Sequence, residues 1–114
     1  MIKLGQSDRY SYPVKVAIVG DGGRRQEFGF DATFKRLSRE EYAAVMSRAR
    51  AGEIDDLVIA RDVLIGWLGV VDDAGEPLPF SETTRDALLD VWPVLPAVVE
   101  AFVEANSPKG RAKN

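Results

Sequence analysis

The chain has 114 residues, a length that suits one domain with its own core. Hydrophobic residues make up 46% and charged residues 29%, which is typical of a globular protein and argues against disorder or membrane residence. The formal net charge of −3 offers no long-range attraction for nucleic acid. The sequence contains neither an apolar run near the ~18 residues of a membrane span nor the apolar stretch of a signal peptide. We therefore expect a soluble cytosolic protein.

The absence of His and Cys excludes several kinds of site. The chain cannot build a Ser-His-Asp or Cys-His nucleophile, or an ordinary zinc or transition-metal centre. It has no disulfide framework, which favours a reducing compartment. The remaining carboxylates, Lys, Tyr and Ser residues do not cluster in a catalytic spacing. We therefore predict a protein that is not an enzyme and that holds no cofactor or metal.

A flexible arm and a β-hairpin are predicted at the start of the chain. Residues 1–12 are mixed and largely polar and are expected to form the arm. From Pro13, apolar residues alternate through Val14, Val16 and Ile18. The glycine-rich segment 20–23 suits the positive φ angles of a hairpin turn. A second alternating run follows, with Phe28, Phe30, Ala32 and Phe34 on one face.

Two helices are expected next. Ser38 and Glu41 have the spacing of a capping box, and Gly52 provides a stop for the first helix. The second helix is predicted over 54–68 and is apolar around most of its circumference, which indicates a central position. Arg61 falls within its apolar stripe, so we expect a neighbouring carboxylate of the same segment to pair with it.

Two further helices and a tail complete the predicted chain. Ser81 is the expected N-cap of a third helix, whose inner face includes Leu88, Leu89 and Trp92. Pro93 ends that helix, and a fourth is predicted over 94–105. The polar, basic residues 106–114 are expected to form a disordered tail.

These elements predict an α+β fold, with the N-terminal β-hairpin packed on a bundle of about four α-helices. A two-stranded hairpin alone is marginal in water, so helices must cover its Phe-rich face. The sequence shows no internal repeat and no linker to a second domain. We therefore expect one α+β domain over residues 13–105.

Three local patterns resemble functional motifs but have simpler explanations. The turn 20–22 follows a strand as in a dinucleotide fingerprint, yet Arg25 stands where the third glycine belongs and another strand follows. The acidic residues of the turn 72–76 could hold a hard cation but lack calcium-loop spacing, which favours a solvated turn. Arg24 and Arg25 could contact nucleic acid, but the negative net charge favours a wet hairpin tip.

Several short motifs are more particular in their order and spacing. They are Phe34-Lys35-Arg36-Leu37-Ser38, Gly66-Trp67, Gly69-Val70, Asp72, Gly75 and Leu78-Pro79-Phe80-Ser81. Together they resemble the tail assembly chaperones of long-tailed bacteriophages and prophages, over most of the chain. The resemblance implies a non-enzymatic protein that coats the tape measure protein and keeps it soluble while tail tube subunits polymerise around it. It also implies a location in the cytoplasm of the bacterial host and absence from the mature virion.

The resemblance implies further partners. Many members of the family also occur in a longer, frameshifted form whose extension recruits tail tube protein, and Ala112-Lys113-Asn114 is compatible with a slippery codon heptamer. A chaperone is expected to be a monomer or to self-associate weakly until its client appears. The alternative is a structural tail-completion or connector protein that forms a ring and stays in the virion.

Aromatic residues are the candidate partner-binding residues: Phe28, Phe30, Phe34, Trp67 and Phe80. A small protein has few residues with which to cover a hairpin that carries three aromatic side chains. An apolar patch left exposed on such a protein marks a protein-binding site. The same residues also suit a core, and the sequence leaves both interpretations open.

Overall fold

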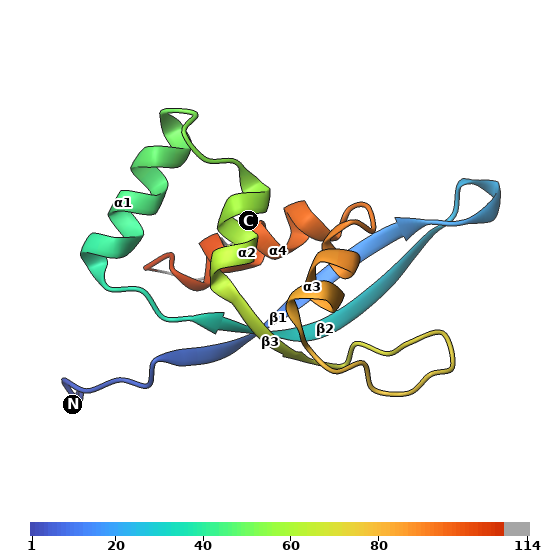
Figure 1. The fold of residues 1–114 in the computed structure, drawn as a ribbon, viewed down its shortest axis with the longest axis horizontal. Helices are drawn as coiled ribbons and strands as arrows, with labels where there is room; N and C mark the ends of the chain where they lie inside the picture. Colours follow the sequence, from blue (N-terminus) through green and yellow to red (C-terminus); the bar gives the residue numbers. More distant parts are fainter. Residues whose placement is uncertain (109–114) are drawn as a thin grey trace.

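The computed structural model describes residues 1–108, which form a three-stranded antiparallel sheet and four α-helices (Figure 1). The elements are β1 (Arg9–Val19), β2 (Arg25–Lys35), α1 (Arg39–Arg50), α2 (Asp56–Val63), β3 (Leu64–Leu68), α3 (Glu82–Leu89) and α4 (Val94–Ala105). The predicted α+β class, with the hairpin packed on the helices, is confirmed. Most of the predicted tail, from residue 109 onward, lies outside the described residues. Within residues 1–108, every helix is too short or too polar to span a bilayer.

The hairpin is longer than predicted. β1 and β2 pair without interruption from Arg9↔Lys35 to Val19↔Arg25. The strand therefore begins at Arg9 instead of Pro13, and the unpaired arm covers residues 1–8. Tyr10 explains the difference, because it continues the inward-facing alternation and its ring lies 5.8 Å from that of the buried Phe34.

The predicted second helix is wrong in its last third. It ends at Val63, and residues 64–68 form β3, which pairs with β2 between Phe34↔Leu64 and Asp31↔Leu68. An apolar run of this length fits a buried strand as well as a buried helix, and periodicity cannot separate the two. Gly66 allows β3 to pair closely with β2, because a Cβ on it would lie 3.2 Å from Thr33 Cβ.

The core lies between the sheet and the helices α2, α3 and α4. The hairpin contributes fully buried Phe34, whose ring meets that of Phe102 on α4 edge to face at 5.5 Å. The remaining buried core residues come from all three strands and these three helices: Val14, Val16, Ala32, Ile59, Ala60, Val63, Leu64, Trp67, Leu89, Val94, Val98 and Ala101. On the opposite face of the hairpin, Lys15, Glu27 and Asp31 are exposed. One face of the sheet is therefore covered, as the predicted alternation requires.

The predicted N-caps of the first and third helices are confirmed. Ser38 Oγ accepts a hydrogen bond from Glu41 N at 3.1 Å, and the Glu41 carboxylate accepts one from Ser38 N at 2.8 Å. Ser81 Oγ accepts one from Thr84 N at 3.1 Å at the start of α3. Each serine hydroxyl accepts a hydrogen bond from a backbone amide that has no partner within the first turn of the helix.

Arg61 has a different partner from the one predicted. Its Nε lies 3.2 Å from Asp86 Oδ1 on α3, and its side chain is half-exposed, outside the core. The neighbouring Asp62 pairs instead with Lys35 on β2 at 2.7 Å. Both ion pairs join α2 to another element, through Lys35 to β2 and through Asp86 to α3.

Two phenylalanines of β2 allow a direct test of this core. We expect Phe34→Ala to lower the free energy of unfolding by about 3–5 kcal/mol, since Phe34 is fully buried. Phe28→Ala, on the same strand face but 50% exposed, should cost about 1 kcal/mol. Urea denaturation followed by circular dichroism measures both. Equal losses would contradict the assignment of Phe34 to the core and of Phe28 to its margin.

Candidate functional site

The far half of the hairpin borders an open groove of about 220 Å³, called the apolar groove below. It is lined by Val16, Ile18, Phe28, Gly29, Phe30, Gly69, Val70, Val71, Leu88, Val91 and Val94. Three of the lining side chains are about half-exposed: Val71 at 54%, Phe28 at 50% and Val91 at 44%. Apolar side chains from separate elements thus converge on one hollow that protein atoms do not fill.

The groove exists because the three strands of the sheet differ in length. β1 and β2 each have 11 residues, whereas β3 has five and pairs only with the part of β2 from Asp31 to Phe34. Phe28 and Phe30 therefore lie beyond the end of β3. Gly69 follows β3 with a φ of +91°, a conformation that favours glycine, and lies beside Phe30 on β2. The chain then continues through Val70 and Val71 as the second wall of the groove.

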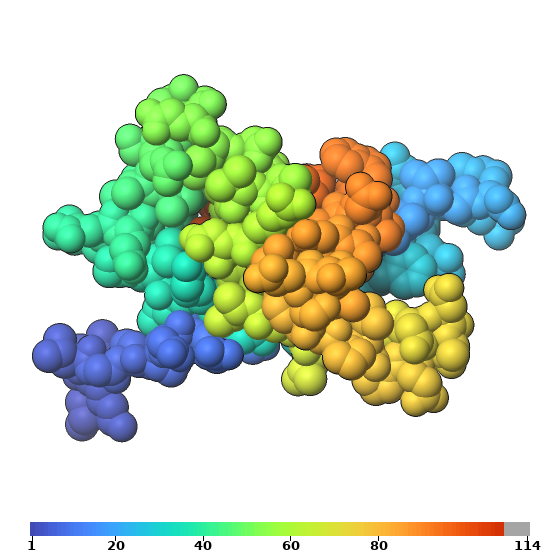
Figure 2. Space-filling model, viewed as in Figure 1, coloured from blue at the N-terminus to red at the C-terminus, as the bar shows by residue number. Residues whose placement is uncertain are grey.

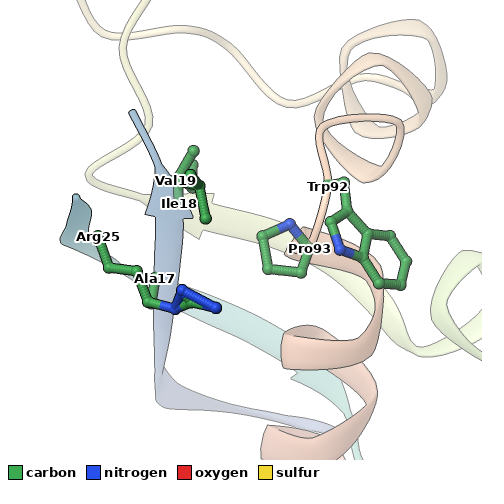
Figure 3. A pocket seen from close by; sticks show the side chains of 6 residues that line it. All are labelled: Ala17, Ile18, Val19, Arg25, Trp92 and Pro93. Atoms are coloured by element: carbon green, nitrogen blue, oxygen red, sulfur yellow. The ribbon is translucent and has the colours of Figure 1, made fainter. Parts of the chain in front are cut away.

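A second hollow of about 400 Å³ adjoins the groove and shares Ile18 with it (Figure 3). It is lined by Ala17, Ile18 and Val19 of β1, by Arg25, and by Trp92 and Pro93 in the link from α3 to α4. In Figure 3, Pro93 lies on the side toward β1 and the Trp92 ring is directed away from the strand. Trp92 is 75% exposed. The prediction that it packs inward on the third helix is wrong, because α3 ends at Leu89 and Trp92 lies beyond it.

An acidic turn follows the groove wall. Asp72 Oδ1 accepts hydrogen bonds from Ala74 N and Glu76 N, both at 2.9 Å, so this carboxylate stabilises the turn itself. Asp73 and Glu76 remain exposed. Residues 69–84 contain no Lys or Arg, which leaves this border negative. Among residues 1–108, no group of three Asp or Glu side chains is placed to hold a metal ion.

The five predicted partner-binding residues do not form one surface. Phe28 and Phe30 line the groove. Phe34 is fully buried, so it cannot contact a partner directly and can only pack beneath residues that do. Trp67 and Phe80 pack edge to face with ring centroids 4.9 Å apart, and Trp67 Nε1 donates to Leu78 O at 2.8 Å.

Sequence reasoning missed Val71, Val91 and Trp92 as surface residues. For Trp92 a signal was present, because a residue directly before a proline avoids the helical conformation. This tryptophan was therefore a poor candidate for the face of a helix. Val71 and Val91 carry no comparable signal, since an isolated valine next to a turn is equally common in a core.

Two titrating groups with shifted pKa values lie away from the groove. Burial raises the pKa of Tyr10, although a hydrogen bond from Asn106 Nδ2 at 3.0 Å opposes the shift. The hydrogen bond from Arg85 lowers the pKa of Asp86, and Arg61 acts in the same direction. Neither group lines the groove, and both join elements of the fold. The groove itself offers shape and apolar surface and no acid–base pair.

The fold and the groove together define a small α+β protein with an unfilled apolar surface at one end. Neither a protein-family model nor a curated protein nor a solved structure matches the chain. The functional proposal therefore depends on the groove and on the sequence motifs.

The two tryptophans provide a readout of the site. We expect Trp67→Phe, which leaves only Trp92, to give a red-shifted emission that acrylamide quenches strongly, because Trp92 is exposed. Trp92→Phe leaves only the buried Trp67, whose emission should be blue-shifted and protected. Steady-state quenching of the two variants measures the difference. Strong protection of Trp92 in the free protein would contradict its exposed position.

Proposed function

We propose that this protein is a non-enzymatic phage tail assembly chaperone whose apolar groove binds segments of the tape measure protein. The observation that carries the proposal is the groove with its half-exposed Val71, Phe28 and Val91. A contiguous apolar patch on a small protein is a common mark of a protein-binding site. The phage-related motifs of the sequence supply the identity of the client.

The physical need for such a protein is clear. A long amphipathic helix without a partner exposes apolar stripes that associate with one another. A groove that receives the apolar face of a helix hides such a stripe while the client waits for the tail tube. The groove is small and open, which favours weak contacts that tube subunits can displace.

The proposal includes the setting that the resemblance implies. The protein acts in the cytoplasm of the bacterial host, holds the tape measure protein soluble and leaves before the virion is complete. A longer, frameshifted form recruits tail tube protein. In the free state the short form is a monomer or a weakly associated oligomer.

Co-expression with the tape measure protein of the same phage or prophage tests the proposal. We expect the wild-type chain to bring the tape measure protein into the soluble fraction and to co-purify with it. The double variant Phe28→Ser, Val71→Ser should bind about tenfold more weakly or worse, because it removes two half-exposed apolar side chains from the groove. Pull-down yield and the soluble fraction of the client are the measurements.

Val58→Ser is the matched control. Val58 is 49% exposed, almost the same as Phe28, but lies on α2 away from the groove. This variant should rescue the client as well as the wild type does. A tape measure protein that stays insoluble and unbound with the wild-type chain would contradict the proposal. Detection of the chain in purified virions would favour the structural tail-completion or connector alternative.

A further inference from the structure

An exposed apolar arm precedes the hairpin. Met1, Ile2 and Leu4 are almost fully exposed, and the arm stands clear of the body of the molecule (Figure 2). Its base is held by Arg36, whose Nε donates to Ser7 O at 2.7 Å and whose backbone N donates to Asp8 O at 2.9 Å. The arm thus presents apolar side chains on a segment whose exit from the fold is defined.

Ile2 and Leu4 cannot both reach the groove of their own chain. From Asp8 to the level of Phe30, the groove residue nearest to the arm and the partner of Val14 in the sheet, the strand covers about 20 Å at about 3.3 Å per residue. From Asp8 back to Leu4 the arm spans at most about 14 Å when fully extended. The hydrogen bonds from Arg36 also hold Asp8 in place. A groove that receives this arm must therefore belong to another copy of the chain.

The arm and the groove are complementary in chemistry. In an extended segment Ile2 and Leu4 project to the same side, and Lys3 projects to the other. Two apolar side chains at this spacing suit a groove lined by Phe28, Val71 and Val91. The arm carries a positive charge at Lys3 and no acidic residue before Asp8, whereas the turn that borders the groove is negative.

We propose that two copies associate by reciprocal exchange of their arms, each arm lying in the apolar groove of the partner. The arm leaves the sheet at the Arg9 end of β1, whereas the groove borders the half of the hairpin nearer its turn, and the molecule is 46 Å long (Figure 1). Two copies placed side by side in opposite directions therefore bring each arm to the partner's groove. The contact closes with two-fold symmetry, so it forms a dimer and not a filament.

This exchange extends the proposed function, because the arm occupies the same groove as the client. A client segment must displace the arm, and the free protein keeps its apolar groove covered when its concentration is high. The arm exchange does not depend on the client, since it requires only the chain itself. Its test is therefore separate from the co-expression experiment.

Sedimentation velocity over a concentration series, with the full chain alone, tests the exchange. We expect a reversible monomer–dimer equilibrium. The arm variant Ile2→Ser, Leu4→Ser and the groove variant Phe28→Ser, Val71→Ser should each raise the dimer Kd about tenfold or more. Combining all four substitutions should add little, because both variants remove the same contact. Val58→Ser should leave the Kd unchanged, and circular dichroism checks that every variant is folded.

Charge reversal provides a second measurement. Lys3→Glu should weaken the dimer, and Asp73→Lys in the same chain should restore part of the loss. In a sample mixed from two isotope-labelled forms, we expect nuclear Overhauser contacts between the methyl groups of Leu4 and the ring of Phe28 across the two copies. A chain that stays monomeric throughout the series, or a dimer whose Kd the arm variant does not change, would overturn the proposal.

Discussion

The structure depends on one constraint, which is that the inner face of the hairpin is longer than the elements that cover it. A hairpin with apolar residues on one face is stable in water only when that face is packed. β3 and α4 supply the packing at the end near Phe34, where the ring of Phe102 completes the core. The other end, at Phe28, extends past β3 and is only partly covered.

Stability and the candidate site are therefore divided along a single strand. Phe34 and Ala32 on β2 are fully buried, Phe30 is partly buried and Phe28 is half-exposed. Side chains at the first end hold the chain folded, whereas those at the second end are free to contact a partner. This separation means that the half-exposed groove residues Phe28, Val71 and Val91 can change with little cost to the core, whereas Val16 and Val94 belong to both. It also explains why the aromatic residues on one face of β2 lie partly in the core and partly at the surface.

The sequence predicted the hairpin face, the helix caps and the fourth helix from local patterns that depend on nearest neighbours. Ser38 and Ser81 satisfy amides within one turn, so their role does not depend on the rest of the fold. The strand at 64–68 could not be predicted in the same way, because an apolar segment adopts the conformation that its neighbours in space require. This segment forms a strand because β2 has a free edge with which it can pair and because Gly66 can approach Thr33 closely. Both conditions depend on the tertiary structure.

The groove was only partly predictable for the same reason. Phe28 and Phe30 could be identified from the alternating pattern, but the position of the opposite wall depends on where β3 and α3 end.

The charges around the groove determine which apolar segments can bind there, because the shape of the groove alone does not discriminate between them. Apolar contact is not directional, so an open groove could associate with any apolar surface, including the groove of another copy. Two grooves brought face to face would also bring two acidic turns together, each with exposed Asp73 and Glu76. Like charges held close in this way oppose the contact, whereas an apolar segment that carries basic residues is attracted. The acidic turn therefore disfavours direct groove-to-groove association and favours basic apolar segments, which is the chemistry of the arm and the chemistry to look for in a client.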